Sequence, residues 1–346
     1  MKQAIIMDVD TGVDDALALV YLLASPEADI LAITCTAGNV TAQHVARNNL
    51  ALLELCGASH IEVALGSEVP LVQPLETSEV THGPQGMGYA ELPAPSTPLS
   101  TRHATEVWAE IARSRPGEVV GLVTGPLTNL ALALRIEPDL PLLLKRLVVM
   151  GGSFNHIGNT TPTSEWNIAV DPEAAKIVFD AFSVLPPDRR PIVCGLDITE
   201  QIDLLPEDMA RIAEIAGSSP AELLSPEQIR GTRSTASNDV VRHLSDAVRF
   251  YVENQSDNGD GYRAHMHDPF AAALAIAPEL AHYRSATVDV ELAGTLTRGT
   301  TVADYRGHWG REHNADIAAA TVPRVFLDQM VERIGLFARN IKGASS

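Results

Sequence analysis

The chain has 346 residues, of which 45% are apolar and 20% are charged. These proportions exclude a disordered chain and supply enough apolar side chains for one large α/β domain or two ordinary ones. Lysine and arginine number 25 against 44 aspartates and glutamates, which gives a net charge of −19. A surface of this charge repels phosphate backbones and anionic membranes, so we expect no nucleic-acid partner and no membrane partner.

The first ten residues lack the apolar stretch of a signal peptide, and no window reaches ~18 uninterrupted apolar residues. We therefore expect a cytoplasmic protein. The three cysteines, Cys35, Cys56 and Cys194, are widely spaced and form no CxxC motif. Their pattern indicates neither a disulfide framework nor a zinc site.

The first 60 residues predict a strand–helix–strand–helix unit. Residues 4–7 form a short apolar run, and residues 13–24 carry apolar side chains at helical spacing that Ser25-Pro26 ends. A second apolar run at 30–35 precedes a second amphipathic helix at 41–56. Strands that alternate with helices favour a parallel sheet with right-handed crossovers.

Three further strands are predicted at 118–123, 147–150 and 192–194, each followed by a small or polar turn. We expect an α/β fold with an open, mostly parallel sheet, Rossmann-like crossovers and helices on both faces. Ligands bind such sheets beyond the carboxyl ends of the strands. The turns at 8–15, 36–39, 124–126 and 150–153 should therefore meet on one rim and form the active site.

The rest of the chain carries weaker signals. Residues 68–100 are rich in Pro, Gly and Ser and predict a long functional loop. Residues 225–262 surround a helix predicted at about 238–254, and we interpret 257–260 as a mobile loop that closes over the site. Short β-like runs at 285–321 precede a final amphipathic helix at 323–337. We found no linker and predict a single domain over residues 1–346.

The segment 8–15 holds four aspartates: Asp8, Asp10, Asp14 and Asp15. Like charges at such spacing repel one another unless a cation or a proton relieves them. One interpretation is a capped helix start with spare acidic residues, because a helix dipole favours negative charge at its first turn. Four acids after a buried strand favour a divalent-cation site instead. Oxygen ligands indicate Ca²⁺ or Mg²⁺ rather than Zn²⁺.

A strand that ends in DxDx[TV] is also typical of phosphatases with an aspartyl nucleophile. Here Asp8-Val9-Asp10-Thr11 is followed by Gly12, where Thr or Val belongs. The acidic composition also offers little to a phosphorylated substrate. We therefore rank this alternative below a hydrolase of another kind.

The stretch DVDTGVDDALAL at 8–19 resembles the N-terminal signature of the inosine–uridine type nucleoside hydrolases. The resemblance reaches about residue 336. It is carried by 36–40 (TAGNV), His82-Gly83, 123–129 (VTGPLTN), 150–152 (MGG), Asn159 with 165–168 (EWNI), 171–175 (DPEAA) and 267–269 (HDP). Thr11 departs from the proline of many members, which changes only the stiffness of the turn.

The resemblance implies a ribonucleoside hydrolase that depends on Ca²⁺. By resemblance, Asp10, Asp15, Asp268 and the backbone carbonyl of Thr124 hold the ion, and Asp10 is also the general base that takes a proton from its water. His267 is the candidate for the acid that protonates the leaving base, and a noncatalytic histidine with a satisfied hydrogen-bond partner is the alternative. Because the water attacks opposite the base, we expect inversion at C1′.

The same resemblance implies the contacts of the substrate. The hydroxyls of the ribose would be bound by Asp14, Asn39, Asn167 and Asp268 at 2′ and 3′, and by Met150, Asn159 and Glu165 at 5′. His82, Trp166, Tyr251 and Gln255 are candidates for the base pocket. For these four, a role in the core, on the surface or at an interface remains an alternative.

The products would be ribose and free nucleobase, as in purine or pyrimidine salvage. The family precedent for assembly is a homodimer or homotetramer. A protein that binds nucleosides or ribose without catalysis is the alternative from another class. It would need neither the base Asp10 nor the acid His267.

Overall fold

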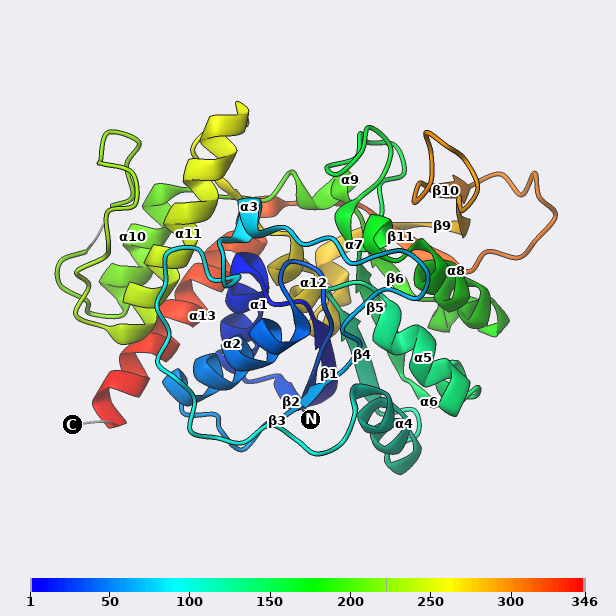
Figure 1. Cartoon of the computed structure of the whole chain (residues 1–346), viewed down its shortest axis with the longest axis horizontal. Coiled ribbons are helices and arrows are strands. Elements are labelled where there is room, and N and C mark those ends of the chain that lie inside the picture. The colour runs from blue at the N-terminus through cyan, green and yellow to red at the C-terminus, as the bar shows by residue number, and fades with distance from the viewer. Residues whose placement is uncertain (1, 222, 345–346) are drawn as a thin grey trace.

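The computed structural model describes residues 2–221 and 223–344. Within these residues, the chain folds around a nine-stranded sheet in the order β10-β9-β11-β6-β5-β4-β1-β2-β3 (Figure 1). The strands are β1 (Gln3–Val9), β2 (Ala28–Cys35), β3 (Glu62–Leu65), β4 (Val119–Val123), β5 (Arg146–Met150), β6 (Ile192–Cys194), β9 (Ala281–Val290), β10 (Thr301–Asp304) and β11 (Ala315–Thr321). Pairing is parallel from β3 to β11, and β9 is antiparallel to both of its neighbours.

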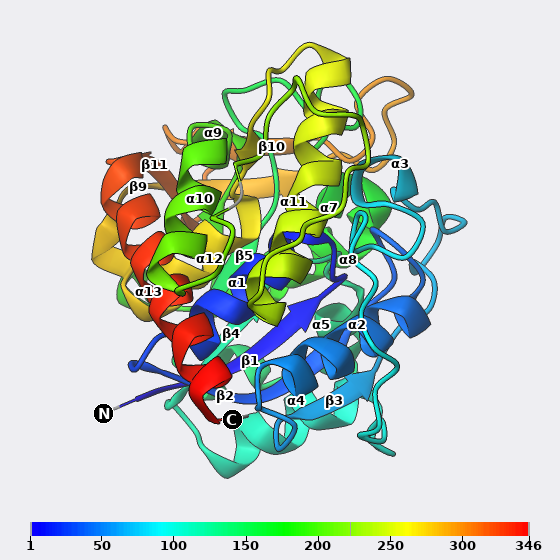
Figure 2. The same ribbon diagram turned by 90° about the vertical axis from the view of Figure 1, so that its left-hand side faces the viewer.

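Helices cover both faces of the sheet (Figures 1 and 2). The apolar core on one face includes α1 (Val13–Leu23), α2 (Ala42–Leu55), α10 (Pro206–Ile215), α11 (Asp239–Asn258), α12 (His267–Ile276) and α13 (Pro323–Ala344). The core on the other face includes α4 (Ala104–Ser114), α5 (Thr128–Ile136), α6 (Leu140–Leu143) and α8 (Pro172–Ala181). The predicted fold class is thus confirmed.

The remaining elements are short. They are α3 (Glu79–His82), α7 (Trp166–Val170), α9 (Leu196–Thr199), the 3₁₀ turns η1 (Phe182–Val184), η2 (Pro187–Arg189) and η3 (Pro278–Leu280), and a short antiparallel pair of strands, β7 (Asp203–Leu204) and β8 (Ala264–His265).

Strand β1 is buried on both sides because it lies in the middle of the sheet. Ile5, Met7 and Val9 enter one apolar core, whereas Ala4 and Ile6 enter the other. Such a strand has no polar face, which explains its continuous apolar sequence. Its one charged side chain, Asp8, comes at the next-to-last residue of the strand.

The strand order reverses at β1, which pairs with β2 on one side and with β4 on the other. Chains diverge at such a switch point and leave a crevice beyond the strand ends. The turn after β4 is tied to β1 there, since Thr124 donates its backbone N–H to the carbonyl of Asp8 at 2.8 Å. The acidic turn and the 124–126 turn are therefore direct neighbours.

Some details differ from the sequence-based expectations. The prediction of a mobile loop at 257–260 is wrong in part. Asp257 and Asn258 form the last turn of α11, and Gly259 caps this helix with φ of 89°. The final helix runs beyond 337, and the long loop at 68–100 contains α3. Strand β3 had no signal, because four residues are too few to show a period. In the described residues, no helix combines the length and apolar character that a membrane span needs.

Candidate active site

Asp8 faces away from the rim, into the core beside α4 and α5. Its Oδ2 accepts a hydrogen bond from Nε1 of Trp108 at 2.9 Å, and its Oδ1 accepts one from Nδ2 of Asn129 at 3.0 Å. Asn129 continues the connection, because its Oδ1 accepts from the backbone N–H of Ser67 at 2.7 Å. Asp8 thus joins β1 to two helices and to the start of the long loop, and it lies outside the acidic cluster.

Asp10 is the first carboxylate on the rim. Its Oδ2 accepts from the backbone N–H of Asn39 at 2.8 Å, whereas its buried Oδ1 has no hydrogen-bond partner in the part of the chain that the structure describes. Burial, followed by the charge of Asp15, raises its pKa well above the usual range of an aspartate. A buried oxygen without a partner is costly, which indicates that a ligand, a water or an ion completes this site.

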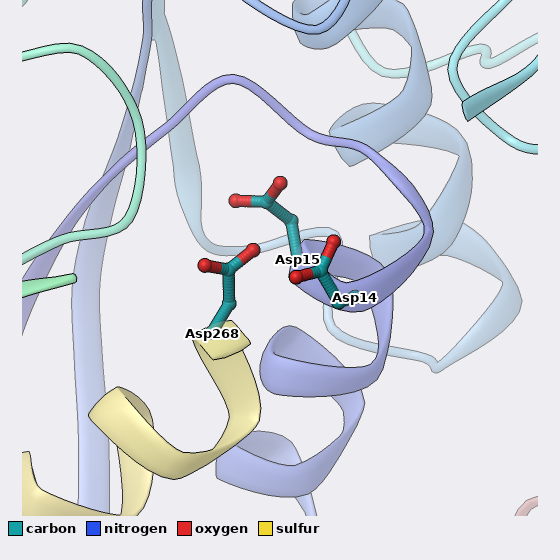
Figure 3. Close-up of side chains that lie close together, drawn as sticks. All are labelled: Asp14, Asp15 and Asp268. Atoms are coloured by element: carbon teal, nitrogen blue, oxygen red, sulfur yellow. The ribbon is translucent and has the colours of Figure 1, made fainter. Parts of the chain in front are cut away.

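Three more carboxylates gather close to one another, as Figure 3 shows, and their charges act on Asp10 or feel its charge. Asp14 and Asp15 come from the first turn of α1, and Asp268 comes from the first turn of α12. One oxygen of each lies within 4.8 Å of the others. Asp15 is oriented at both of its oxygens, by the backbone N–H of Gly12 at 2.8 Å and by Oγ1 of Thr124 at 2.7 Å.

The charges of this acidic cluster are mutually unfavourable. Burial and then the charge of Asp15 raise the pKa of Asp14 to about 7. Burial and the charges of the neighbouring aspartates raise the pKa of Asp268 well above its usual range. A bound divalent cation would remove this repulsion, and an all-oxygen donor set fits a hard ion. The residues present therefore fit a metal site.

The turns after β4 and β5 are joined above the sheet by Asn167 of α7. Its Nδ2 donates to the carbonyl of Thr124 at 2.7 Å and lies 3.2 Å from the carbonyl of Met150. Glu165 caps α7, since its oxygens accept from the backbone N–H groups of Asn167, Ile168 and Gly152 at 2.8–3.1 Å. The Thr124 carbonyl keeps a second lone pair for a further partner.

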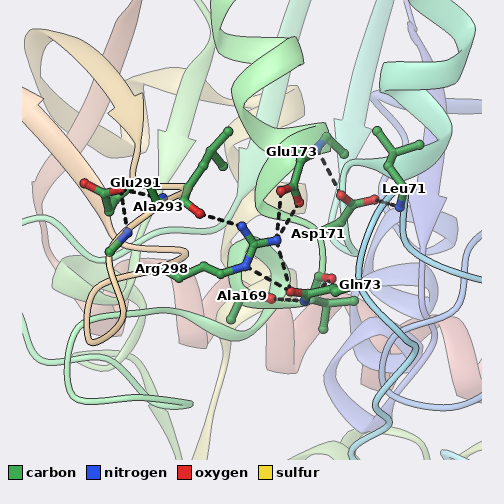
Figure 4. A network of polar contacts seen from close by, with 12 residues as sticks. Leu71, Gln73, Ala169, Asp171, Glu173, Glu291, Ala293 and Arg298 are labelled. Carbon is green, nitrogen blue, oxygen red and sulfur yellow. Dashed lines mark hydrogen bonds and ion pairs between the residues drawn. The ribbon is translucent and has the colours of Figure 1, made fainter.

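A polar network ties the end of α7 to Gln73, which in turn accepts from Arg298 (Figure 4). Arg298 donates to both carboxylate oxygens of Glu173 at 2.8 and 2.9 Å. Gln73 donates to the carbonyls of Ala169 and Val170, which end α7. Segments far apart in sequence thereby fix the helix that carries Trp166 and Asn167.

The acidic cluster opens into a cavity of about 110 Å³. Its lining is formed by Asp14, Asn39, Ser78, Thr81, His82, Thr124, Met150, Asn159, Thr160, Glu165, Trp166, Asn167, Tyr251, His267 and Asp268. A second, larger polar chamber of about 620 Å³ shares Thr81, Asn159, Tyr251 and His267 with it and adds Gln255 and His265, among others. Of the residues predicted from sequence, Gln255 lines only this second chamber.

His82 reaches the site from α3. Its Nδ1 accepts the backbone N–H of Val13 at 3.1 Å and lies 3.9 Å from Asp14. Burial lowers the pKa of His82 to about 4. The ring is therefore neutral, with its proton on Nε2, and it stands 5.8 Å from the ring of Tyr251. Tyr251 is buried, so its side chain belongs to the cavity and not to an outer surface.

His267 begins α12, directly before Asp268. Its Nδ1 lies 2.7 Å from Oγ1 of Thr199, the last residue of α9. Burial, followed by the charges of His265 and His82, lowers the pKa of His267 to about 3. Thr199, Thr81 and His265 were not singled out from sequence, because a lone polar residue in an apolar or loop segment carries no positional signal.

The structure brings the predicted turns to one rim, and most of the predicted residues line one cavity. Asp10 and Asp15 are not among its lining residues, but their charges act on Asp14 and Asp268, which are. Asn159 is exposed, and its Oδ1 accepts from the backbone N–H of Trp166 at 2.9 Å. The individual roles assigned by resemblance stay predictions.

Comparison with known proteins identifies the family of the chain. The sequence model of the inosine-uridine preferring nucleoside hydrolase family matches residues 5–328. A pyrimidine-specific ribonucleoside hydrolase, RihA, from Citrobacter koseri is 37% identical over 339 residues, which cover 98% of this chain and 100% of RihA. RihA of Salmonella newport is 35% identical over the same length, with the same coverage.

Solved structures agree as well. A purine-preferring ribonucleoside hydrolase from Gardnerella vaginalis superposes with a TM-score of 0.86 at 27% identity, covering 98% of this chain and 100% of that one. A plant nucleoside hydrolase, PpNRh1, gives a TM-score of 0.84 at 26% identity, covering 96% and 99%. The fold and site thus define a hydrolase of N-glycosyl bonds. The chain belongs to the inosine–uridine nucleoside hydrolase family.

Proposed function

We propose that this enzyme hydrolyses the N-glycosidic bond of ribonucleosides in a Ca²⁺-dependent reaction, and that it releases ribose and free nucleobase for purine or pyrimidine salvage. The observation that carries the proposal is the buried acidic cluster at the sheet's switch point, with an Asp10 oxygen beside it that has no hydrogen-bond partner among residues 2–221 and 223–344. A carboxylate-rich cavity suits a reaction whose transition state develops positive charge on the ribose ring.

The ion would be held by Asp10, Asp15, Asp268 and the carbonyl of Thr124. All four offer oxygen, the donor that Ca²⁺ prefers, and Asp14 lies close enough to add its charge. When bound, the ion would orient the ribose diol and lower the pKa of water.

Asp10 is the general base of the proposed reaction. The backbone N–H of Asn39 occupies its Oδ2, so its free Oδ1 is the atom that accepts the proton of the attacking water. Asp14, Asn39, Asn167 and Asp268 would bind the 2′- and 3′-hydroxyls, and Met150, Asn159 and Glu165 would surround the 5′-hydroxyl. Attack from this side, opposite the base, inverts the configuration at C1′.

The nucleobase would lie on the side of His267, where the cavity meets the larger polar chamber. His267 would give the departing base its proton, and His82, Trp166, Tyr251 and Gln255 would surround the base. The RihA relatives are pyrimidine-specific and the Gardnerella enzyme prefers purines. Both base classes therefore belong in a substrate test.

The direct test is a panel of purine and pyrimidine ribonucleosides with chromatographic detection of free base. We expect base release that a chelator abolishes and Ca²⁺ restores. Calorimetric binding of a nucleoside without base release would overturn catalysis and favour a binding protein. Full turnover in the chelator would overturn the metal requirement. Hydrolysis of p-nitrophenyl phosphate in place of nucleosides would favour the aspartyl phosphatase alternative.

A further inference from the structure

Thr199 makes a contact that the reaction scheme above does not use. It is fully buried at the end of α9, and its Oγ1 lies 2.7 Å from Nδ1 of His267. No other side-chain hydrogen bond of Thr199 occurs within residues 2–221 and 223–344. A buried hydroxyl whose one side-chain partner is an active-site imidazole points to a role in holding that ring.

The contact distinguishes the two ring nitrogens of His267. Nδ1 is occupied by Thr199, whereas Nε2 has no hydrogen-bond partner in the part of the chain that the structure covers. Because His267 lines both the cavity and the polar chamber, Nε2 is the nitrogen left for a substrate. His265 stands 5.6 Å away, ring to ring, and is paired with Asp203 at 2.9 Å instead.

The orientation of the ring needs such a support. The χ2 torsion of histidine is broad and nearly two-fold, so packing alone selects an orientation only weakly. A hydrogen bond to one nitrogen fixes both the ring's direction and the nitrogen that can transfer a proton. Backbone placement of α9 at the end of β6 delivers the hydroxyl to that position.

We infer that Thr199 is a positioning residue for protonation of the leaving base: it binds Nδ1 of His267 and so directs Nε2 at the nucleobase. The inference rests on the proposed function, in which His267 is the acid. The C1′–N bond breaks with its electron pair on the base, which takes the Nε2 proton. Water forms the new C1′–O bond and gives its proton to Asp10. Burial lowers the pKa of His267 when no substrate is present, so the ring carries protons on both nitrogens only with a nucleoside bound, when negative charge that builds on the departing base favours the imidazolium. Nδ1–H then donates to the Thr199 oxygen, and the neutral ring left after the transfer keeps this proton, so it does not turn.

The test compares two leaving groups. Nucleobases need protonation, whereas the phenolate of p-nitrophenyl β-D-ribofuranoside departs without it. Thr199→Val removes the hydroxyl at nearly constant volume, and Thr199→Ser keeps it. We expect Thr199→Val to lower kcat for a nucleoside about tenfold or more, because misplaced catalytic groups cost up to ~100-fold. Its kcat for the phenyl riboside should stay within about twofold, and Thr199→Ser should restore nucleoside turnover.

A second arm uses His267→Ala, in which Thr199→Val should cause no further loss. Equal losses on both substrates, or an additional loss in the His267→Ala background, would overturn the inference, since either means a general structural effect. If Thr199→Val fails to fold, Thr199→Ser and Thr199→Ala are compared in the same two assays. Failure of the proposed function looks different: the unmodified enzyme would then release no base, or His267→Ala would spare nucleosides.

Discussion

At the scale of single residues, the four aspartates of the acidic turn divide into two environments. Asp8 belongs to the strand, and donors from Trp108 and Asn129 meet both of its oxygens. Asp10 lies two residues later, beyond the strand, and none of the described residues forms a hydrogen bond to its Oδ1. A strand that continued to Asp10 would give both side chains the same face. Because β1 ends at Val9, the side chain of Asp10 instead meets the turn at Asn39.

We expect Asp10→Asn to lower kcat for base release by about 10²–10⁴-fold, because an amide cannot accept the proton of the attacking water. Its melting temperature should change little or rise. Burial raises the pKa of Asp10, which means that the ionised carboxylate is unfavourable in the folded protein, and the substitution removes this charge. Steady-state kinetics and thermal denaturation measure the two effects. Full turnover by this variant would refute the assignment of Asp10.

Asp8→Asn is the matched control. In the unmodified protein, Trp108 Nε1–H and Asn129 Nδ2–H each donate to a separate oxygen of Asp8. Asparagine has a single acceptor oxygen for these two donors. One donor is left unsatisfied, which costs ~1–3 kcal/mol of the free energy of unfolding. At 25 °C the folded fraction should keep kcat within about threefold of the unmodified enzyme. A catalytic loss as large as that of Asp10→Asn would show that Asp8 acts in the reaction.

At the scale of elements, the long loop owes its conformation to contacts with helices rather than to structure of its own. Its only helix, among the described residues, is α3, which holds His82 over the cavity. The anchor of α3 is Asn254 of α11, whose Nδ2 donates to the carbonyl of Val80 at 3.0 Å. Near the far end of the loop, Glu54 accepts from the backbone N–H groups of Ser96 and Thr97 at 2.7 and 2.5 Å.

We expect Asn254→Ala to raise KM for nucleosides several-fold and to change kcat less. The loss of a hydrogen bond costs ~1 kcal/mol, which corresponds to an increase in KM of about fivefold if the bond keeps α3 closed on the substrate. Ser256→Ala, an exposed position two residues along α11, is the control and should match the unmodified enzyme. A loss of kcat at unchanged KM would show instead that Asn254 acts on the chemical step.

At the scale of the whole molecule, charge is the dominant feature. The net charge is −19, and part of the negative charge is buried where α1 and α12 begin. Helix N-termini favour carboxylates, but the mutual repulsion of four carboxylates in one place is larger than the stabilisation that two helix dipoles provide. A bound cation would therefore act on the stability of the fold as well as on the chemistry.

The metal-free protein should lose stability as the pH rises from about 4 to about 7. Burial raises the pKa of Asp14 to about 7, so the folded state keeps a proton that the unfolded chain has lost. The free energy of unfolding then falls with increasing pH across this window. Ca²⁺ needs the ionised carboxylates, so its stabilising effect should grow over the same window.

Thermal denaturation at pH 5 and pH 8, with Ca²⁺ or with a chelator, measures how the stability and its dependence on Ca²⁺ change with pH. At pH 8 and a concentration of about 100 times Kd, Ca²⁺ should raise Tm by about 5 °C, and at pH 5 by less. Asp15→Asn is the matched variant. It should be more stable than the unmodified protein without metal at pH 8, because it removes a buried charge and the Thr124 hydroxyl, unlike the N–H donors at Asp8, can turn to accept from the new amide. It should also lose the Ca²⁺ shift. An equal Ca²⁺ shift at both pH values would contradict a site built on these carboxylates.

The single domain over 1–346 and the homodimer or homotetramer stay predictions, and light scattering on the purified protein measures the latter. The burial of each strand explains which strands could be predicted from the sequence. Strands β1, β2, β4, β5 and β6 were found because each is an apolar run that ends in a polar turn. Strands at the antiparallel edge were only approximate, since half-exposed strands such as β9 mix polar and apolar residues.

By itself, the sequence determined the fold class, the rim and the acidic character of the site, because periodicity and strand-end turns are local properties of the chain. Only the tertiary structure decided which oxygens are free. Asp8 and Asp10 look alike in sequence, yet one is satisfied by Trp108 and Asn129, about a hundred residues away, and the other is left open. The same holds for Thr199, whose role depends on a hydrogen bond to His267 across 68 residues. Such contacts follow from packing, and packing has no local signature.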